Sequence, residues 1–500
     1  MKPLLLVVFC VLGANVFCQN VICPENPIGE RVRDISYFQI VGKIGGHILV
    51  YENEKTQNFL QVYDDSMKVI RNIKLTFHPE KFLFTKFIDY PDFAWMIYVY
   101  RRNNLDFFVA AKINADGEVV GEPKVLDTTH VSVGATFFFN ILTSNDKSKI
   151  LIYKDHRQLD RVDLSNLVFN SDMQLIHHSE NVTYYNKNEE LFENFTINNE
   201  GDWIFTREKH SNIESFPRSE ILNAQLYIQY HNEDTFRIRE LPLEKTHLQT
   251  LSLNVDNLNK NIILNSLYSS NWNIAGIYTA VWNESDTNWS TSKVTELGKT
   301  IRGLANPKGS AETALNDYYI RQVLLKNDGG FIVAAEQRKS IYSTPNPDIP
   351  DRSPSSSLYD TYHQDSRQFL GSPKTEVNTH DSAAEFGNIL VLDADSSSNL
   401  QWGNVVPKNQ FGDLDLGWIG FASVYRGDML NFIYNEPYKQ TWLLQNQSVT
   451  SEGKVSANPL MRGLQNKYIF MPSRGRQVGT SEFIIPVIHR SNLCFAKVNF

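Results

Sequence analysis

Short apolar runs that end in polar residues recur along this chain of 500 residues, and this repeat limits the possible folds more than any other feature. The runs are rich in Ile, Val, Phe, Tyr and Trp, a composition that favours buried strands over helices. In order, they are HILVYENE from His47, AWMIYVYRR from Ala94, KILIYKDHR from Lys149, DWIFTREKH from Asp202, NIILNSLYS from Asn261, GGFIVAAEQR from Gly329, DMLNFIYNE from Asp428 and EFIIPVIHR from Glu482.

The spacing of these runs defines a repeat. The equivalent positions are Ile48, Trp95, Ile150, Trp203, Ile262, Phe331, Met429 and Phe483, and the steps between them are 47, 55, 53, 59, 69, 98 and 54 residues. A repeat of about 50 residues therefore occurs eight times, with one enlarged member. Each run is followed by a second strand, a polar turn and a third strand, as in FFVAAKINADGEVVGEP from Phe107.

The stretch LVLDADSSSNLQWG from Leu390 lies where the repeat predicts a polar turn, but its alternating polar residues resemble the start of a calcium-binding loop. An EF-hand loop beginning at Asp393 needs Gly at its sixth position and Glu at its twelfth, but the chain has Ser398 and Asn404 there. Asp, Asn and Ser also favour turns, since they bond their own backbone. We therefore expect a hairpin turn around Asp395 and no metal site.

Repeats of four antiparallel strands predict an all-β fold, a β-propeller of eight blades, with seven as the alternative. Inner strands that are buried on both faces should be apolar throughout. The last repeat, NLCFAKVNF, stops one strand short, and the residues after Gln19 are expected to supply that strand. We expect residues 19–500 to form one propeller domain whose ring is closed by N-terminal and C-terminal strands.

The N-terminus predicts export. The chain begins with Lys2 and an apolar run from Leu4 to Leu12, as a secretory signal peptide does. We expect cleavage between Cys18 and Gln19, which would remove residues 1–18. A lipid on Cys18 is the alternative, although the bulky Phe17 disfavours it. No later stretch has the roughly 20 apolar residues of a membrane span. The mature protein is expected to be secreted or periplasmic, without a transmembrane segment, and monomeric.

Two cysteines remain after the leader, Cys23 and Cys494, near opposite ends of the mature chain. Disulfides persist in exported proteins, and a bridge across this loop could stabilise the fold by about 5 kcal/mol. If the ends meet on adjacent strands, a disulfide joins them; two unpaired thiols are the alternative.

The composition and the missing motifs exclude several functions. A net charge of −8 and a pI near 5.9 argue against a nucleic-acid surface. The chain contains no GxSxG, HExxH, GxxxxGK[ST] or CxxC motif. We therefore expect no cofactor and no metal.

One part of the chain resembles other proteins. The stretches ALNDYYIRQVLLKNDGGFIVAAE, FGNILVLDADSSSNLQWGNVVPKNQ and MLNFIYNE resemble uncharacterised exported proteins of Bacteroidota, over about 314–436. The resemblance implies an exported propeller and no particular activity.

The polar ends of the apolar runs predict the functional face. If each run is the second strand of its blade, ten charged residues lie toward one mouth: Glu52, Arg101, Arg102, His156, Arg207, Glu336, Arg338, Glu436, His489 and Arg490. A long loop insertion, rich in Pro and Ser, is expected at about 339–386 beside this mouth. Arginine matches carboxylate or sulfate groups and stacks on sugar rings.

These features favour an exported, non-catalytic protein that binds a glycan, peptide or protein partner through one propeller face. Two alternatives remain. The first is a carbohydrate-active hydrolase or lyase that uses Glu336 with Glu436 or Glu52 as paired carboxylates. The second is a scaffold in an envelope complex.

Overall fold

A computed structural model describes residues 20–23, 35–54, 57–77, 82–130, 136–213, 219–270, 273–283, 285, 288–306, 315–342, 368–370, 382–413, 418–438, 441–457 and 468–500. The protein is all-β, and its sheets are antiparallel. Within these ranges, no helix has the length and apolarity to cross a membrane. The predicted signal peptide at residues 1–18 lies outside the described residues.

The strands form four-stranded units, each an up-and-down meander. Unit 1 contains β2 (Ile35–Ile44), β3 (His47–Glu54), β4 (Gln57–Tyr63) and β5 (Val69–Lys74). Unit 2 contains β6 (Phe84–Asp89), β7 (Phe93–Arg102), β8 (Leu105–Asn114) and β9 (Val119–His130). Unit 3 contains β10 (Thr136–Thr143), β11 (Lys149–Arg157), β12 (Arg161–Asn170) and β13 (Leu175–Tyr184). Unit 4 contains β14 (Glu190–Ile197), β15 (Trp203–His210), β16 (Ile221–Gln229) and β17 (Arg237–Glu240).

The second half of the chain continues the pattern. Unit 5 contains β18 (His247–Asp256), β19 (Asn261–Ser270), β20 (Asn273–Asn283) and β21 (Thr291–Glu296), and is followed by α1 (Lys299–Ala305). Unit 6 contains β22 (Tyr318–Leu325), β23 (Phe331–Tyr342), β25 (Ser382–Ala394) and β26 (Leu400–Val406), with β27 (Gln410–Asp413) beside β25. Unit 7 contains β28 (Phe421–Arg426), β29 (Met429–Tyr438), β30 (Thr441–Val449) and β31 (Val455–Ala457). Unit 8 contains β32 (Tyr468–Phe470), the 3-10 helix η4 (Pro472–Arg474), β33 (Arg476–Gln477), β34 (Glu482–His489), β35 (Asn492–Asn499) and β1 (Asn20–Ile22).

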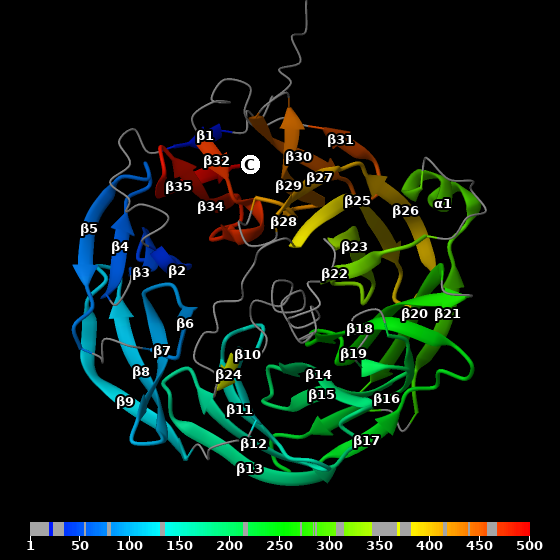
Figure 1. The fold of residues 1–500 in the computed structure, drawn as a ribbon, viewed down its shortest axis with the longest axis horizontal. Coiled ribbons are helices and arrows are strands. Elements are labelled where there is room, and N and C mark those ends of the chain that lie inside the picture. Colours follow the sequence, from blue (N-terminus) through cyan, green and yellow to red (C-terminus); the bar gives the residue numbers. More distant parts are fainter. Residues whose placement is uncertain are drawn as a thin grey trace, which may run out of the picture.

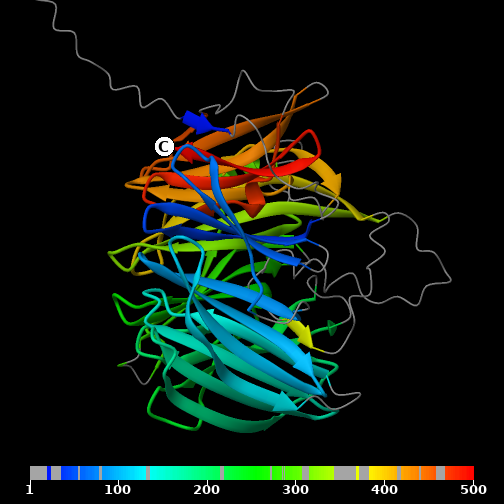
Figure 2. The same ribbon diagram turned by 90° about the vertical axis from the view of Figure 1, so that its left-hand side faces the viewer.

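The units follow one another around a common centre in chain order, with the first strand of each unit innermost and the last strand outermost (Figure 1). Figure 2 shows the molecule turned by 90° about the vertical axis, and most strands run roughly across this view. These strands therefore run roughly along the line of sight of Figure 1. Units 4 and 5 share one eight-stranded sheet, joined by the pairing of Ile221 with Leu248.

The eight apolar runs form the second strands of the eight units, as the repeat predicts: β3, β7, β11, β15, β19, β23, β29 and β34. These strands are apolar without alternation because both of their faces are buried. Val50 of β3 packs against unit 8, for example, while its neighbours Leu49 and Tyr51 pack against unit 2.

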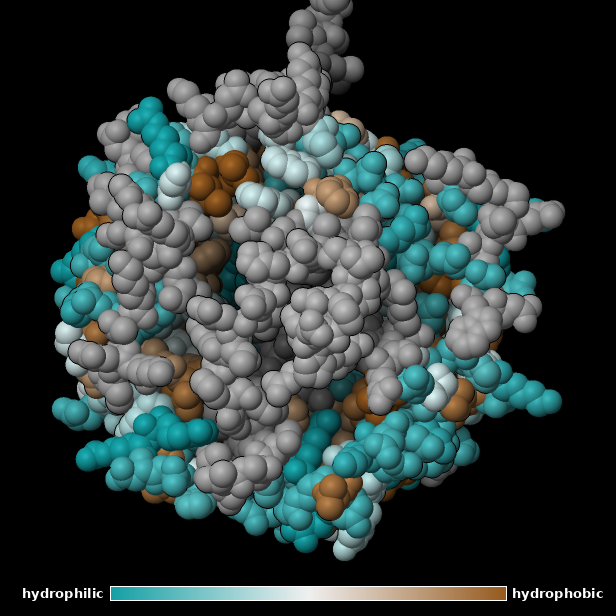
Figure 3. Space-filling model, viewed as in Figure 1, coloured by the Kyte–Doolittle hydropathy of each residue, from teal (hydrophilic) through white to brown (hydrophobic). Residues whose placement is uncertain are grey.

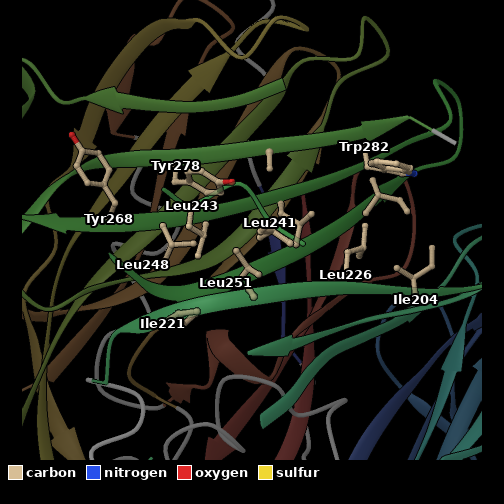
Figure 4. Close-up of a cluster of buried hydrophobic side chains, with 14 of the residues drawn as sticks. Ile204, Ile221, Leu226, Leu241, Leu243, Leu248, Leu251, Tyr268, Tyr278 and Trp282 are labelled. Carbon is tan, nitrogen blue, oxygen red and sulfur yellow. The ribbon is translucent and has the colours of Figure 1, made fainter. Parts of the chain in front are cut away.

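Eight hydrophobic clusters of described residues lie between consecutive units. Pairs that represent them are Leu49 with Met96, Ile97 with Ile150, Tyr153 with Phe205, Leu226 with Trp282, Ile263 with Val333, Val391 with Phe432, Ile433 with Ile485, and Phe495 with Val50. Figure 4 shows the cluster between units 4 and 5, where Leu241 and Leu243 lie between side chains of the two units. The last pair joins unit 8 to unit 1.

The predicted turn at Asp395 is confirmed. This residue lies between β25 and β26, and its Oδ1 accepts the backbone N–H groups of Ser397 at 2.9 Å and Asn399 at 2.8 Å. These bonds hold the pKa of Asp395 below its usual range. The carboxylate therefore closes the turn, as an Asx motif does.

The N-terminal strand completes unit 8, also as predicted. Asn20, Val21 and Ile22 of β1 pair with Asn499, Val498 and Lys497 of β35. The expected disulfide is not formed, because Cys23 and Cys494 are both free thiols. The two thiols nevertheless lie near enough for Cys23 to add to the raised pKa of Cys494, after burial and Glu52. Burial raises the pKa of Cys23 to about 11 and that of Cys494 to about 12.

The insertion expected at about 339–386 begins and ends in regular structure. Its first and last residues belong to a strand pair, in which Lys339 lies opposite Glu385 and Tyr342 opposite Ser382. Within it, β24 (Gln368–Leu370) pairs with β10 of unit 3. Residues 343–367 and 371–381 lie outside the described part of the chain.

Candidate functional site

Nine of the ten predicted site residues lie within second strands, most of them in the C-terminal half, and Arg490 follows one; Glu336 lies in the middle of β23 rather than at its end. Glu52 is in β3, Arg101 and Arg102 in β7, His156 in β11, Arg207 in β15, Glu336 and Arg338 in β23, Glu436 in β29 and His489 in β34, and Arg490 follows β34. Hydrophilic residues predominate around the rim of the face seen in Figure 3.

The end of β7 combines an aromatic stack with arginine. Tyr98, Tyr100 and Arg102 alternate along one face of the strand. The rings of Tyr98 and Tyr100 lie 6.2 Å apart, and Tyr100 stacks on Phe107 of β8 at 5.0 Å with only 8° between the ring planes. Tyr100 and Phe107 are half-buried, and Arg102 is exposed. Half-buried aromatic rings, which also pack against the hydrophobic cluster between units 1 and 2, thus lie together with an exposed guanidinium group at this end of β7.

Arg101 lies on the opposite face of β7 and is held in place. Its Nε and Nη2 donate to the two carboxylate oxygens of Asp106 at 2.7 and 3.0 Å, and Asp106 is fully buried. This bidentate hydrogen bond raises the pKa of Arg101. Arg101 therefore anchors the β7–β8 turn.

Arg207 and His156 are also paired. Arg207 donates to Glu190 at 2.8 Å, to the Tyr227 hydroxyl at 3.1 Å and to the Tyr184 carbonyl oxygen at 2.9 Å. Burial lowers the pKa of Arg207, but the hydrogen bonds to Glu190 and Tyr227 outweigh it and raise the pKa overall. His156 lies 3.5 Å from Asp163.

Glu336 and Lys408 form a fully buried ion pair in unit 6. Both side chains have 0% exposure, and Nζ of Lys408 lies 2.8 Å from Oε1 of Glu336. Lys408 also donates to Gln410 at 2.9 Å. On the other side, Nε of Arg321 lies 3.4 Å from Oε2 of Glu336. Burial lowers the pKa of Lys408, although Glu336 opposes this shift.

The remaining predicted residues are divided between interior and surface. Glu52 is fully buried and accepts a hydrogen bond of 2.8 Å from Gln61. His489 is buried and stacks on Tyr468 at 4.6 Å. Arg338 is buried, with its guanidinium 5.1 Å from the ring centre of Phe386. Glu436 is exposed and accepts a hydrogen bond from Gln445, while Arg490 is exposed.

The sequence reasoning did not predict a cavity of about 320 Å³. Its described lining comes from β22, β28, η4, β33 and β34, and consists of Arg321, Gln322, Phe421, Ala422, Ser423, Ser473, Gly475, Arg476, Gln477 and Phe483. None of the ten predicted residues is in this set. First strands supply half of this lining, and one lining residue, Phe483, comes from a second strand.

Arg476 crosses from unit 8 to units 1 and 2. Its Nη1 donates to the carbonyl oxygens of Ile40 and Val41 at 2.9 and 2.8 Å, and its Nη2 donates to Asp89 at 2.7 Å. Burial raises the pKa of Asp89, but Arg476 and Lys147 outweigh it and hold the pKa below its usual range. The guanidinium is thereby fixed in one orientation at the cavity.

One further cluster has the composition of a cation site. Ligand atoms of Glu200, Asp202 and His231 lie within 4.8 Å of one another. Protein donors already use the Asp202 carboxylate, however: His231 donates its backbone N–H at 2.7 Å, and Asn198 donates at 2.7 Å. Lys260 pairs with Glu200. These contacts give the cluster a structural role between turns.

No family model matches the chain, and no curated protein matches it. Among solved structures, an uncharacterized protein from Listeria monocytogenes is 10% identical, with 80% of this chain and 90% of that chain covered and a TM-score of 0.37. Prolyl oligopeptidase B from Galerina marginata is 10% identical, with 92% and 56% covered and a TM-score of 0.38. A polysaccharide lyase is 8% identical, with 83% and 89% covered and a TM-score of 0.37. The chain thus spans little more than half of the oligopeptidase, and likenesses at these scores carry no argument about function.

Proposed function

We propose that the eight units are the blades of a closed β-propeller. Two observations support closure. The cluster around Phe495 and Val50 packs unit 8 against unit 1, in the same way as the other clusters pack neighbouring units. The N-terminal strand β1 supplies the outermost strand of unit 8, so the two ends of the chain meet in one sheet. This arrangement buries apolar faces of units 8 and 1 against each other, which an open row of sheets would leave exposed.

We further propose that this propeller is an exported binding protein that recognises a glycan, peptide or protein partner at the rim where the second strands end. The observation that carries this proposal is the aromatic stack of Tyr100 and Phe107 beside the exposed Arg102. Flat aromatic faces stack on sugar rings and on aromatic side chains, and arginine adds hydrogen bonds in a fixed plane. Within the stated range of partners, this combination favours a glycan.

The enzyme alternative has less support from the same rim. A glycosidase of the common type needs two carboxyl groups that reach a sugar from opposite sides. Glu336 is fully buried against Lys408, and Glu52 is fully buried against Gln61. Only Glu436 of the three candidate carboxylates is exposed. The scaffold alternative and the resemblance to exported proteins of Bacteroidota remain predictions.

A glycan array probed with the purified protein tests the binding proposal. We expect Arg102→Ala to weaken any glycan signal at least tenfold, and Tyr100→Ala to remove it. Arg237→Ala is the matched control, since Arg237 is an exposed arginine 4.7 Å from the ring centre of Tyr230, on the outermost strand of unit 4. Signals that survive both rim substitutions unchanged would place the binding surface elsewhere.

A further inference from the structure

We infer that the outer edge of β13 is a dimerisation surface, at which the same strand of a second copy of this chain pairs antiparallel. β13 is the outermost strand of unit 3 and lies at the periphery of the molecule (Figure 1). This inference goes beyond the proposed function, which concerns the end of β7 in unit 2, and either one can fail without the other. It also differs from the monomer that the sequence analysis predicts.

The first argument is that this edge of β13 is open. Within the described ranges, β13 pairs with β12 alone, so the backbone N–H and C=O groups on its other side have no partner strand there. The pairing with β12 runs without a bulge from His177 to Tyr184, and the edge is therefore regular over this length. A strand of another chain can extend such a sheet through main-chain hydrogen bonds.

The second argument is that β13 lacks the features that protect the outermost strands of the other units. Proteins usually protect an edge strand by short length, charged side chains, proline or a covering element. The strands β1 and β31 have three residues each, and β17 has four, three of them charged. Lysine is present in β5, β9 and β21, and α1 lies against β26. In contrast, β13 has ten residues, no lysine, arginine or proline, and Glu180 as its only acidic residue.

The third argument is the exposure of apolar side chains along the same strand. Ile176, Val182 and Tyr184 are 49%, 58% and 68% exposed. His178 and Glu180 lie between them and are also exposed, whereas the residues that alternate with these are partly or fully buried. Branched and aromatic side chains on a regular open edge favour pairing with another strand, because the paired strand covers them.

Charge complementarity identifies a second copy as the partner. If a two-fold axis passes beside Ser179, His178 of each chain lies opposite Glu180 of the other, and Ile176 lies opposite Val182. Each of these cross-strand pairs joins like with like in polarity and occurs twice in the dimer. Within one chain, Nε2 of His178 already lies 3.6 Å from Oε1 of Glu180. An axis beside Glu180 would instead oppose two carboxylates, so the first register is favoured.

Sedimentation velocity on the whole protein tests the inference. Between about 1 and 100 µM, we expect the mass to rise from one chain to two and no further, because a two-fold contact uses the edge of both copies. Val182→Lys puts a lysine on the edge and should raise the dissociation constant of the dimer at least tenfold, equivalent to about 1.4 kcal/mol. Val120→Lys is the matched control, since Val120 is 50% exposed on β9, the outermost strand of unit 2, and it should leave the dissociation constant unchanged.

A charge exchange tests the register. His178→Glu and Glu180→Lys should each weaken self-association, because they put two carboxylates, or a lysine and a histidine, opposite each other. An equimolar mixture of the two variants should dimerise more tightly than either alone, since the new carboxylate at position 178 then meets the new amine at position 180. The inference is overturned if Val182→Lys dimerises as tightly as Val120→Lys, or if mixing restores nothing. A wild-type protein that stays monomeric would also overturn it and leave the edge to an extended segment of a different protein.

Discussion

The substitution Glu336→Gln tests the energetics of an ion pair in which both side chains are fully buried. It leaves Lys408 with no exposure and without its ionic partner at 2.8 Å, and it removes the acceptor that Arg321 approaches at 3.4 Å. Breaking a buried ion pair from one side costs about 3–5 kcal/mol, because the remaining charge stays in a poorly solvated place. We expect a loss of stability in that range near neutral pH.

The pH dependence gives the prediction a second observable. Burial holds the pKa of Lys408 below its unfolded value of 10.5, so the unfolded chain binds this proton more tightly than the folded one. Stability from this group therefore rises as the pH increases toward 10.5. Without Glu336, which raises the pKa of Lys408, the lysine loses its proton more easily. The cost of Glu336→Gln should accordingly be larger at pH 6 than at pH 9.

Urea denaturation followed by tryptophan fluorescence measures both effects. Glu436→Gln is the matched control, because Glu436 is also a carboxylate on a second strand but is exposed. Its cost should be within about 0.5 kcal/mol. Equal midpoints for the two variants, or a cost of Glu336→Gln that does not change with pH, would refute the reasoning.

Two further predictions concern packing and alkaline stability. Gly475→Ala should destabilise the protein by about 1–3 kcal/mol, because the new methyl group collides with Phe483, whereas Gly298→Ala meets nothing within 4 Å and should be almost neutral in the same denaturation assay. Burial raises the pKa values of Tyr90 and Tyr98 to about 12, so their contribution to stability is complete below pH 10 and is lost between pH 10 and pH 12. Melting temperatures should therefore fall across that interval, and a constant melting temperature would contradict the burial of these hydroxyl groups.

The architecture was predictable from the sequence because it depends on local and repeated signals. Ile48 and its seven equivalents mark strands that are buried on both faces. Such strands are visible in the sequence as continuous apolar runs, and here the runs recur along the chain. The turn at Asp395 follows from the hydrogen bonds of its own side chain with the next residues. The strand β1 could be anticipated because the last repeat is one strand short.

The candidate sites were less predictable because they depend on contacts between distant segments. Lys408 follows β26 in a stretch that reads as a polar turn, and nothing local indicates that it is buried against Glu336. Arg476 contacts Ile40, Val41 and Asp89 because unit 8 lies beside units 1 and 2, which are first in the sequence. The PSRGRQ stretch around Gly475 was the available signal, since it puts arginines on both sides of a glycine.

The central claim is that the N-terminal strand completes the last unit of a closed propeller, and a paired-cysteine cross-link tests it most directly. Cys23 and Cys494 are first replaced by alanine. In this background, the test variant combines Val21→Cys with Val498→Cys, which lies directly opposite. The control variant combines Val21→Cys with Lys497→Cys, whose side chain points to the other face of the sheet. After mild oxidation and proteolysis, mass spectrometry should find an intrachain link between positions 21 and 498 and none between 21 and 497. Free thiols at both positions of the first variant, or links between separate chains, would contradict the claim.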